Sequence, residues 1–175
     1  RTIGLLFSEI SGDFFSPLLR GIEAVAQDEN YGLLVYATHG GDAISSNKPL
    51  LVGDHNCDGA IVFVDSLTEQ ALSRLTQNDF PVVLIHHSSP PGLQIPTVTV
   101  ENKKGSFQVV EHLIVHHGYK RIGFLAGLEN HEDSYWREMG YREAMEKHGL
   151  TPDPHLRTVG GFDREIARKA ILELM

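Results

Sequence analysis

The sequence predicts an α/β protein built from doubly wound parallel sheets. Short apolar runs rich in β-branched residues alternate with longer amphipathic segments along the chain, and most of the apolar runs are nearly continuous. Strands that are buried on both faces of a parallel sheet have this continuous pattern, because helices cover each face. The alternation of strand and helix then implies right-handed crossovers between parallel strands.

The apolar runs predict seven strands. They lie at residues 2–7, 33–38, 60–64, 82–86, 97–100, 122–126 and 156–159. Ligands of doubly wound sheets bind beyond the carboxyl ends of the strands. We therefore expect ligand-binding side chains directly after each apolar run.

Apolar residues at helical spacing predict four helices. The first places Phe15, Leu18, Leu19, Ile22, Val25 and Ala26 on one face, and the second places Phe107, Val110, Leu113 and Ile114. The third runs from about Ser134 to His148, and Gly149 provides its C-terminal stop. The last starts at the N-cap Asp163, and its expected buried face is Ile166, Ala167, Ala170, Ile171 and Leu174. A further helix is expected within 39–49, limited by Pro49.

Composition indicates an ordinary globular protein of the cytoplasm. Hydrophobic residues make up 41% of the 175 residues and charged residues 22%, and both values are usual for such proteins. No apolar run has membrane-spanning length, and no basic and apolar leader precedes the first strand. The single cysteine, Cys57, excludes an internal disulfide and fits a reducing compartment. Because the chain opens on a strand and closes inside a helical pattern, we expect it to be part of a longer protein.

The charge distribution argues against nucleic-acid binding by this segment. The net charge is −8, of which residues 1–100 contribute −7 and residues 101–175 contribute −1. A protein that binds nucleic acid needs a basic face to neutralise phosphates. Neither half of the chain provides one.

The sequence lacks the motifs of several catalytic and cofactor-binding sites. The turn at 8–15 holds one glycine, Gly12, and two acidic residues, so it matches neither the dinucleotide-binding motif nor the P-loop. The sequence contains no G-x-S-x-G nucleophile elbow. Asp65 and Glu101 follow strands, but the sequence does not show that they face each other. We expect no catalytic residues, no cofactor and no enzyme activity.

The ten histidines do not form a metal-binding pattern. His86-His87 and His116-His117 are adjacent pairs whose side chains diverge in a strand or helix, and neither has a partner at ligand spacing. His116 and His117 are interpreted as a solvated helix end, where cationic or polar residues suit the helix dipole. His86 ends a strand at the ligand-facing edge, so a structural role and a binding role both remain open.

A different set of residues suits the binding of a small polar ring. Phe14 and Phe15 follow the first strand, Arg137 lies on the third helix, and Phe162 follows the last strand. Aromatic faces stack on the C–H face of a sugar or on a base, and an arginine fixes hydroxyls or a carboxylate. By spacing alone, each aromatic residue also fits a core position.

Seven sequence motifs in order resemble those of the LacI/GalR family of transcription regulators. They are the segments 2–6, 12–15, 18–23, 57–62, 80–85, 111–127 and 137–141. The most specific segment contains Glu111-His112-Leu113, and it continues through Gly118-Tyr119-Lys120-Arg121-Ile122 to Gly127. It is much less similar to the ribose-type periplasmic binding proteins. Arg137 and Gly140-Tyr141 match the family motif R-x-x-G-F/Y.

The resemblance implies a periplasmic-binding-protein-like type I fold of two lobes, with the second incomplete. The expected division is an N-terminal lobe at 1–127 and a partial C-terminal lobe at 128–175. A small polar effector, sugar-like or nucleoside-like, is expected to bind in the cleft between the lobes and to control operator affinity. Operator DNA would be bound by a helix-turn-helix preceding Arg1, in a homodimer with no membrane partner. The alternative is a periplasmic solute-binding protein of a sugar transporter.

The resemblance also implies a set of ligand-binding residues. The set is Phe14, Phe15, His131, Asp133, Arg137 and Phe162. His86 joins these candidates through its position at the ligand-facing end of a strand. The sequence departs from the family where an Asp-Arg pair is common, because His86-His87 stands there, and this argues against a simple pentose or hexose. Glu101-Asn102 replaces the usual Asp-Asn.

Overall fold

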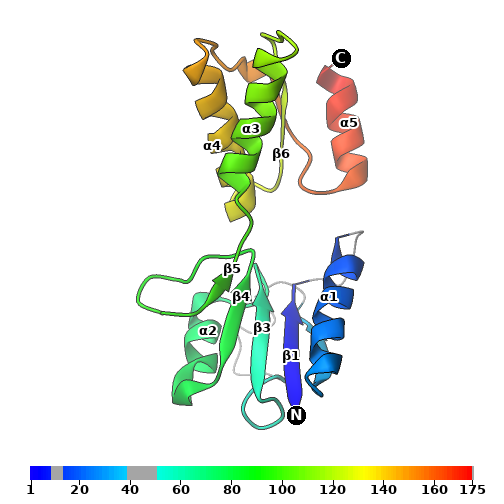
Figure 1. The fold of residues 1–175 in the computed structure, drawn as a ribbon, viewed down its shortest axis with the longest axis vertical. Helices are drawn as coiled ribbons and strands as arrows, with labels where there is room; N and C mark the ends of the chain where they lie inside the picture. The colour runs from blue at the N-terminus through cyan, green and yellow to red at the C-terminus, as the bar shows by residue number, and fades with distance from the viewer. Residues whose placement is uncertain (9–13, 39–50, 175) are drawn as a thin grey trace. The chain divides into compact units, whose positions relative to one another are not determined.

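A computed structural model describes residues 1–8, 14–38 and 51–174 (Figure 1). The chain divides into two compact units, Arg1–Thr99 and Val100–Met175. Each unit is described by itself below. The turn at 9–13 and the helix expected within 39–49 lie outside the described residues.

The first unit contains a five-stranded parallel sheet in the order β2-β1-β3-β4-β5. Its strands are β1 (Thr2–Phe7), β2 (Gly32–Ala37), β3 (Gly59–Phe63), β4 (Val82–Ile85) and β5 (Thr97–Val98). All the pairings are parallel, and β1 lies between β2 and β3. The chain therefore winds outward in both directions from β1, which confirms the predicted fold class.

Alternating side chains of this sheet pack in two clusters. Leu6 and Val62 pack with Leu72 of α2 (Glu69–Leu75). Leu5 and Phe63, which point the other way, pack with the apolar side of α1 (Phe15–Asp28). The near-continuous apolar strands arise from this burial on both faces. Helix α2 was not predicted, although the Thr68 side chain caps it by accepting a hydrogen bond from the Ala71 amide at 3.2 Å.

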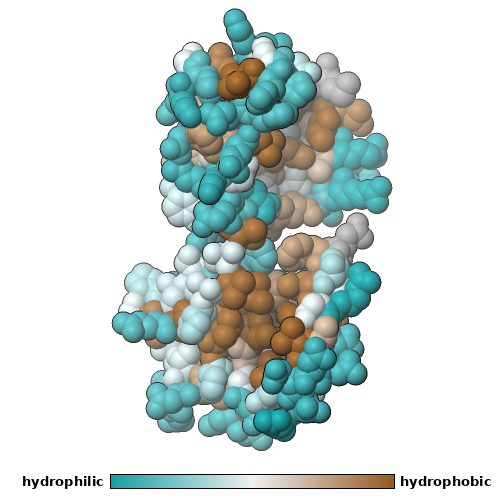
Figure 2. Space-filling model, in the orientation of Figure 1, coloured by the Kyte–Doolittle hydropathy of each residue, from teal (hydrophilic) through white to brown (hydrophobic). Residues whose placement is uncertain are grey.

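Part of the predicted inner face of α1 remains accessible. Val25 is 65% exposed. With Ile3, Leu18, Ile22 and Leu33, it lines an apolar hollow of about 560 Å³. Figure 2 shows apolar side chains gathered over this unit. Val25 therefore lies on the predicted apolar face of α1 but is not buried.

The second unit contains a two-stranded parallel sheet, with helices on both sides (Figure 1). Its elements are α3 (Asn102–Val115), β6 (Phe124–Ala126), α4 (Glu132–Lys147), β7 (Arg157–Val159) and α5 (Arg164–Leu174). Helix α3 packs on α4 around a cluster that includes Val110, Tyr141 and Met145. A Cβ atom at Gly140 would lie 2.1 Å from the Lys103 carbonyl oxygen. Glycine at this position therefore allows the two helices to approach closely.

The boundary between the two units differs from the boundary expected between lobes at 1–127 and 128–175. The structure places the division between Thr99 and Val100. Helix α3 belongs with α4, and β6 pairs with β7 rather than with the first sheet. Periodicity identifies a strand from its own residues but does not identify the strand beside it, and this explains the difference.

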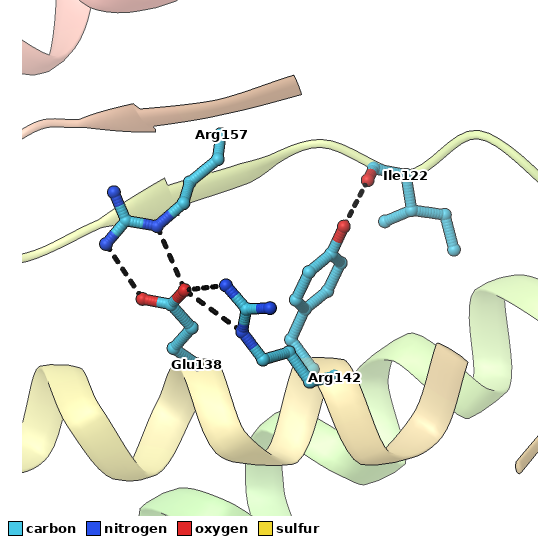
Figure 3. Close-up of polar contacts among 5 residues, drawn as sticks. Ile122, Glu138, Arg142 and Arg157 are labelled. Atoms are coloured by element: carbon cyan, nitrogen blue, oxygen red, sulfur yellow. Dashed lines mark hydrogen bonds and ion pairs between the residues drawn. The ribbon is translucent and has the colours of Figure 1, made fainter. Parts of the chain in front are cut away.

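Polar contacts tie α4 to the strands of the second unit (Figure 3). Arg157 of β7 donates two hydrogen bonds to the Glu138 carboxylate, each of 2.9 Å, and Arg142 donates to the same group at 2.7 Å. The Tyr141 hydroxyl donates to the Ile122 carbonyl at 2.9 Å. The Arg157 hydrogen bonds, followed by those of Arg142, lower the pKa of Glu138.

Helix α5 begins as predicted but is buried less than predicted. The Asp163 side chain caps it by accepting a hydrogen bond from the Ile166 amide at 2.8 Å. Ala170 is buried, whereas Ile166 and Ile171 are 53% and 44% exposed. The burial predicted for these two residues is wrong, because a two-stranded sheet covers only one stripe of the helix. No helix among the described residues is long and apolar enough to cross a membrane.

Candidate functional site

A pair of aromatic rings, one exposed and one half-buried, lies at the carboxyl ends of the strands in the first unit. Phe14 directly precedes α1 and is 60% exposed. The His86 ring, after β4, meets the Phe14 ring edge to face at 5.2 Å and lies 6.1 Å from the Phe63 ring. Phe15 points instead into the core, where its ring packs edge to face on Phe7 at 4.5 Å. Phe14 and His86 are therefore the predicted residues that this unit brings together.

Unusual backbone conformations accompany the strand ends. Asp65, His86 and Phe162 follow β3, β4 and β7, and they have φ angles of 58°, 58° and 61°. A left-handed backbone costs a residue with a Cβ atom about 1–2 kcal/mol. Such residues concentrate at functional sites. Phe162 is the most unusual, because a bulky aromatic residue rarely adopts this conformation.

The Phe162 ring is the central feature of the second unit's candidate site. The residue is 53% exposed. A Cβ atom at Gly127 would lie 2.2 Å from Cζ of Phe162, so glycine after β6 leaves room for the ring. His131 meets the ring edge to face at 5.0 Å, and the Arg137 guanidinium carbon lies 5.7 Å from the ring centroid. An aromatic face, an imidazole and a cation are thus grouped at the carboxyl ends of β6 and β7.

A hydrogen-bond network orients Arg137. Its Nε donates to Oδ1 of Asn102 at 2.6 Å, and Nδ2 of Asn102 donates to Oδ1 of Asp133 at 2.7 Å. Nη2 of Arg137 also lies 3.6 Å from Oδ2 of Asp133, one helical turn earlier. Asp133 is buried, with 6% exposure. The Asp133 carboxylate is therefore shielded from solvent and lies next to the Arg137 guanidinium.

His131 supplies a buried nitrogen to the same cluster. Its Nδ1 atom has no hydrogen-bond partner within the part of the chain that the structure describes. Buried polar atoms without partners are uncommon in folded proteins. This nitrogen belongs to the ring that contacts Phe162.

The family described as "Periplasmic binding proteins and sugar binding domain of LacI family" matches residues 1–175. The chain belongs to this family. The predicted resemblance to the LacI family and the predicted fold class are confirmed. Among the curated relatives of this LacI-family chain, the transcriptional repressor CytR of Escherichia coli (strain K12) is 31% identical over 180 residues. The match covers 100% of this chain and 51% of CytR.

Two further comparisons agree. The transcriptional regulator RegA of Clostridium saccharobutylicum is 29% identical over 159 residues, which cover 89% of this LacI-family chain and 47% of RegA. The crystal structure of the Escherichia coli repressor ascG superposes with a TM-score of 0.78 at 22% identity, over 99% of this chain and 64% of that one. The chain spans about half the length of the curated relatives that it matches. These relatives are transcription regulators, which favours the regulator over the transport alternative.

Sequence reasoning missed two contributors to the site of this LacI-family chain. Asn102 enters the sequence-based prediction only because Glu101-Asn102 differs from the family pattern. Asn102 is the first residue of α3, and its side chain accepts a hydrogen bond from Arg137. Gly127 directly follows a predicted strand, where a glycine often marks a close approach. Within residues 1–8, 14–38 and 51–174, no group of three or more His, Cys, Asp or Glu side chains is arranged to hold a metal ion.

Proposed function

We propose that the chain is the effector-binding part of a transcription regulator and that the residues grouped around Phe162 bind a small polar molecule. The observation that carries the proposal is the arrangement around Phe162, where an exposed ring lies beside a guanidinium oriented by Asn102 and Asp133. Such a pair suits a ligand with a flat apolar face and oxygen acceptors at its edge. Within the first unit, Phe14 and His86 are proposed as ligand contacts.

Binding at such a site requires no catalysis. A ligand that binds one conformation more tightly than another shifts the protein towards that conformation. A regulator that is a homodimer transmits such a change to its DNA-binding parts, because half-site spacing on DNA is fixed. The whole protein is proposed to act in this way on operator DNA in the cytoplasm. The kinds of relatives that the chain matches support this proposal.

Replacement of Arg137 by lysine tests the proposal. A lysine ammonium keeps the charge but does not reproduce the planar fork. We expect Arg137→Lys to weaken effector binding by about 1.5–3 kcal/mol, the range for a hydrogen bond to a charged group. The effector is first identified by ligand-shift screening of the full-length protein against sugars, nucleosides and sugar acids, and its affinity is then measured by calorimetry.

The matched control is Arg168→Lys, because Arg168 is exposed on α5 and pairs with Glu165, three residues earlier, at 3.3 Å. Its affinity should equal that of the wild type. A folded Arg137→Ala variant with unchanged affinity would contradict the proposed role of the guanidinium.

A further inference from the structure

We propose that His112 and His117 bind one divalent transition-metal ion, of the zinc, nickel and copper class, at the C-terminal end of α3. The site shares no residue with the cluster around Phe162, and it lies at the other end of α3 from Asn102. It is therefore separate from the proposed effector site. The observation that carries it is the distance between two imidazole nitrogens.

The two nitrogens have the spacing of neighbouring metal ligands. Nε2 of His112 lies 3.2 Å from Nε2 of His117. Zinc binds imidazole nitrogen at about 2.0–2.1 Å, so two nitrogens on one ion lie about 2.9 Å apart at a right angle and about 3.3 Å apart at the tetrahedral angle. The observed separation falls between these values. A small rotation of the exposed side chains is enough to direct both nitrogens at one ion.

The end of α3 brings the two histidines together. Residues five apart lie about 140° from each other around a continuous helix, so helical spacing alone would separate His112 from His117. Helix α3 ends at Val115, and Gly118 has a left-handed φ of 69°, with its amide bonded to the Ile114 carbonyl at 3.0 Å. His117 lies within this turn and there meets His112. A contact that depends on the turn is not visible in the helical pattern of the sequence.

Neighbouring rings restrict the two imidazoles. The His117 ring stacks on the Tyr119 ring, with 5.7 Å between centroids and 13° between planes. The His112 ring lies 4.7 Å from the His116 ring. Side chains that are already restricted lose less conformational entropy when they bind. All four residues are exposed, so an ion reaches the nitrogens from solvent.

The charges around the site permit a cation. The C-terminal end of a helix carries partial negative charge, which favours cations. Among the charged residues next to the two histidines in sequence, Glu111 accepts a hydrogen bond from Lys147 at 2.7 Å, and Arg121 lies 3.9 Å from Asp153. Lys120 is exposed, so water and salt screen its repulsion of a bound ion. The nearest basic side chains are therefore paired or screened.

The donor atoms select the class of ion. Neutral imidazole suits zinc, nickel and copper, whereas magnesium and calcium prefer oxygen ligands. No third His, Cys, Asp or Glu side chain in the described part of the chain is arranged to join the pair. Water therefore fills the remaining positions on the ion. Such a two-histidine site binds more weakly than structural zinc sites, which have four protein ligands.

A bound ion takes the place of a shared proton. Without the ion, the contact is a hydrogen bond in which Nε2 of one ring donates to Nε2 of the other. When the ion binds, the donor ring carries its proton on Nδ1 instead, so both Nε2 atoms offer lone pairs. Each ring stays neutral, as a metal ligand must.

Zinc titration by calorimetry tests the site on the full-length protein, prepared without a histidine tag and freed of metal. We expect His112→Ala and His117→Ala each to weaken zinc binding at least about tenfold, because loss of an outer-shell partner alone weakens metal sites about 10–100-fold. Both residues are exposed, so both variants should keep the wild-type melting temperature in the absence of zinc. Unchanged zinc affinity in either variant overturns the proposed pair.

Two further histidines provide matched controls. His116→Ala keeps both proposed ligands, and His155→Ala removes an exposed histidine of the short 3-10 helix Pro154–Leu156, so both variants should bind zinc as the wild type does. A loss in His116→Ala with normal binding in His117→Ala would assign the ion to His112 and His116 and overturn the proposed pair. Absence of zinc binding by the wild type also overturns it, and effector binding by the same protein is independent of that result.

Nitrogen-15 NMR of the imidazole rings assigns the ligand atoms. Zinc should shift the Nε2 signals of His112 and His117 and leave a proton on each Nδ1, whereas the His155 signals should not change. Magnesium added in place of zinc should shift neither ring. A zinc-dependent shift in only one of the two rings would show that they do not share an ion, and the inference would be overturned.

Discussion

At the scale of single residues, Phe162 combines three features that ordinary packing does not explain. Its backbone is left-handed, its ring is half exposed, and the tip of the ring lies over Gly127. The backbone conformation costs about 1–2 kcal/mol. A residue held in this way is expected to serve a ligand rather than the core.

Truncation of Phe162 separates these two roles. A core phenylalanine loses about 3–5 kcal/mol of folding stability when it is replaced by alanine. Because Phe162 is 53% exposed, we expect Phe162→Ala to cost much less stability and to lower effector affinity strongly. Melting temperature and affinity are measured together on the full-length protein.

Phe162→Gly is the matched comparison. Glycine adopts φ of 61° without strain, so this variant should be at least as stable as Phe162→Ala and should bind equally poorly. A much lower melting temperature with normal affinity would show that Phe162 is a packing residue.

At the scale of the elements, the close approach of α3 and α4 builds the Arg137 network. The approach depends on Gly140, where an added Cβ atom would lie 2.1 Å from the backbone of α3. This contact gives a physical reason for the glycine in R-x-x-G-F/Y. The motif combines the arginine with the residue that allows its partner helix to come near.

Alanine at position 140 should push the two helices apart. We expect Gly140→Ala to lower the free energy of unfolding by about 1–3 kcal/mol, the range for overpacking. Gly105→Ala is the control, because nothing lies within 4 Å of its Cβ position in α3 and alanine favours a helix there. Denaturant unfolding of the two variants should therefore shift in opposite directions. Similar shifts would contradict the close-approach explanation.

The contact between α4 and β7 predicts a dependence of stability on pH. The hydrogen bonds of Arg157, then those of Arg142, lower the pKa of Glu138 in the folded state. The unfolded chain therefore binds a proton first as the pH falls. The stabilising contribution is fully present above the ordinary glutamate pKa of about 4.3 and is lost as the pH falls through the lowered value.

Glu138→Gln removes this titration. We expect the variant to have a lower melting temperature than the wild type at pH 7. The difference between the two melting temperatures should narrow between pH 5 and the acidic limit of folding. Thermal unfolding over this pH range measures it. Glu165→Gln, which breaks an exposed pair with Arg168, should change neither value appreciably. A difference that stays constant with pH would contradict the assignment to Glu138.

At the scale of the whole molecule, the net charge disfavours DNA binding by this chain. Residues 1–175 carry −8, and residues 1–100 alone carry −7. Phosphate contacts need basic side chains, so we expect this chain to show no specific DNA complex in an anisotropy titration at modest salt. A nanomolar complex with a defined operator would contradict this expectation.

The sequence by itself determined the strands, the main helices, the family and the end of each sheet where the site residues gather. These features depend on periodicity and on motifs within short stretches, so neighbouring residues specify them. Phe14, His86 and Phe162 were expected after strands and lie there in their units. Arg137 was expected on the third helix and lies on α4, beside the Phe162 ring. Their roles as ligand contacts remain predictions.

Only the tertiary structure decided which strands share a sheet, which face of α5 is covered, and what holds Arg137. The division between Thr99 and Val100 depends on the packing of α3 on α4. Asn102 reaches Asp133 and Arg137 across 31 and 35 residues of sequence. No local pattern encodes contacts at that separation, because they arise when helices pack with a particular spacing that here requires Gly140.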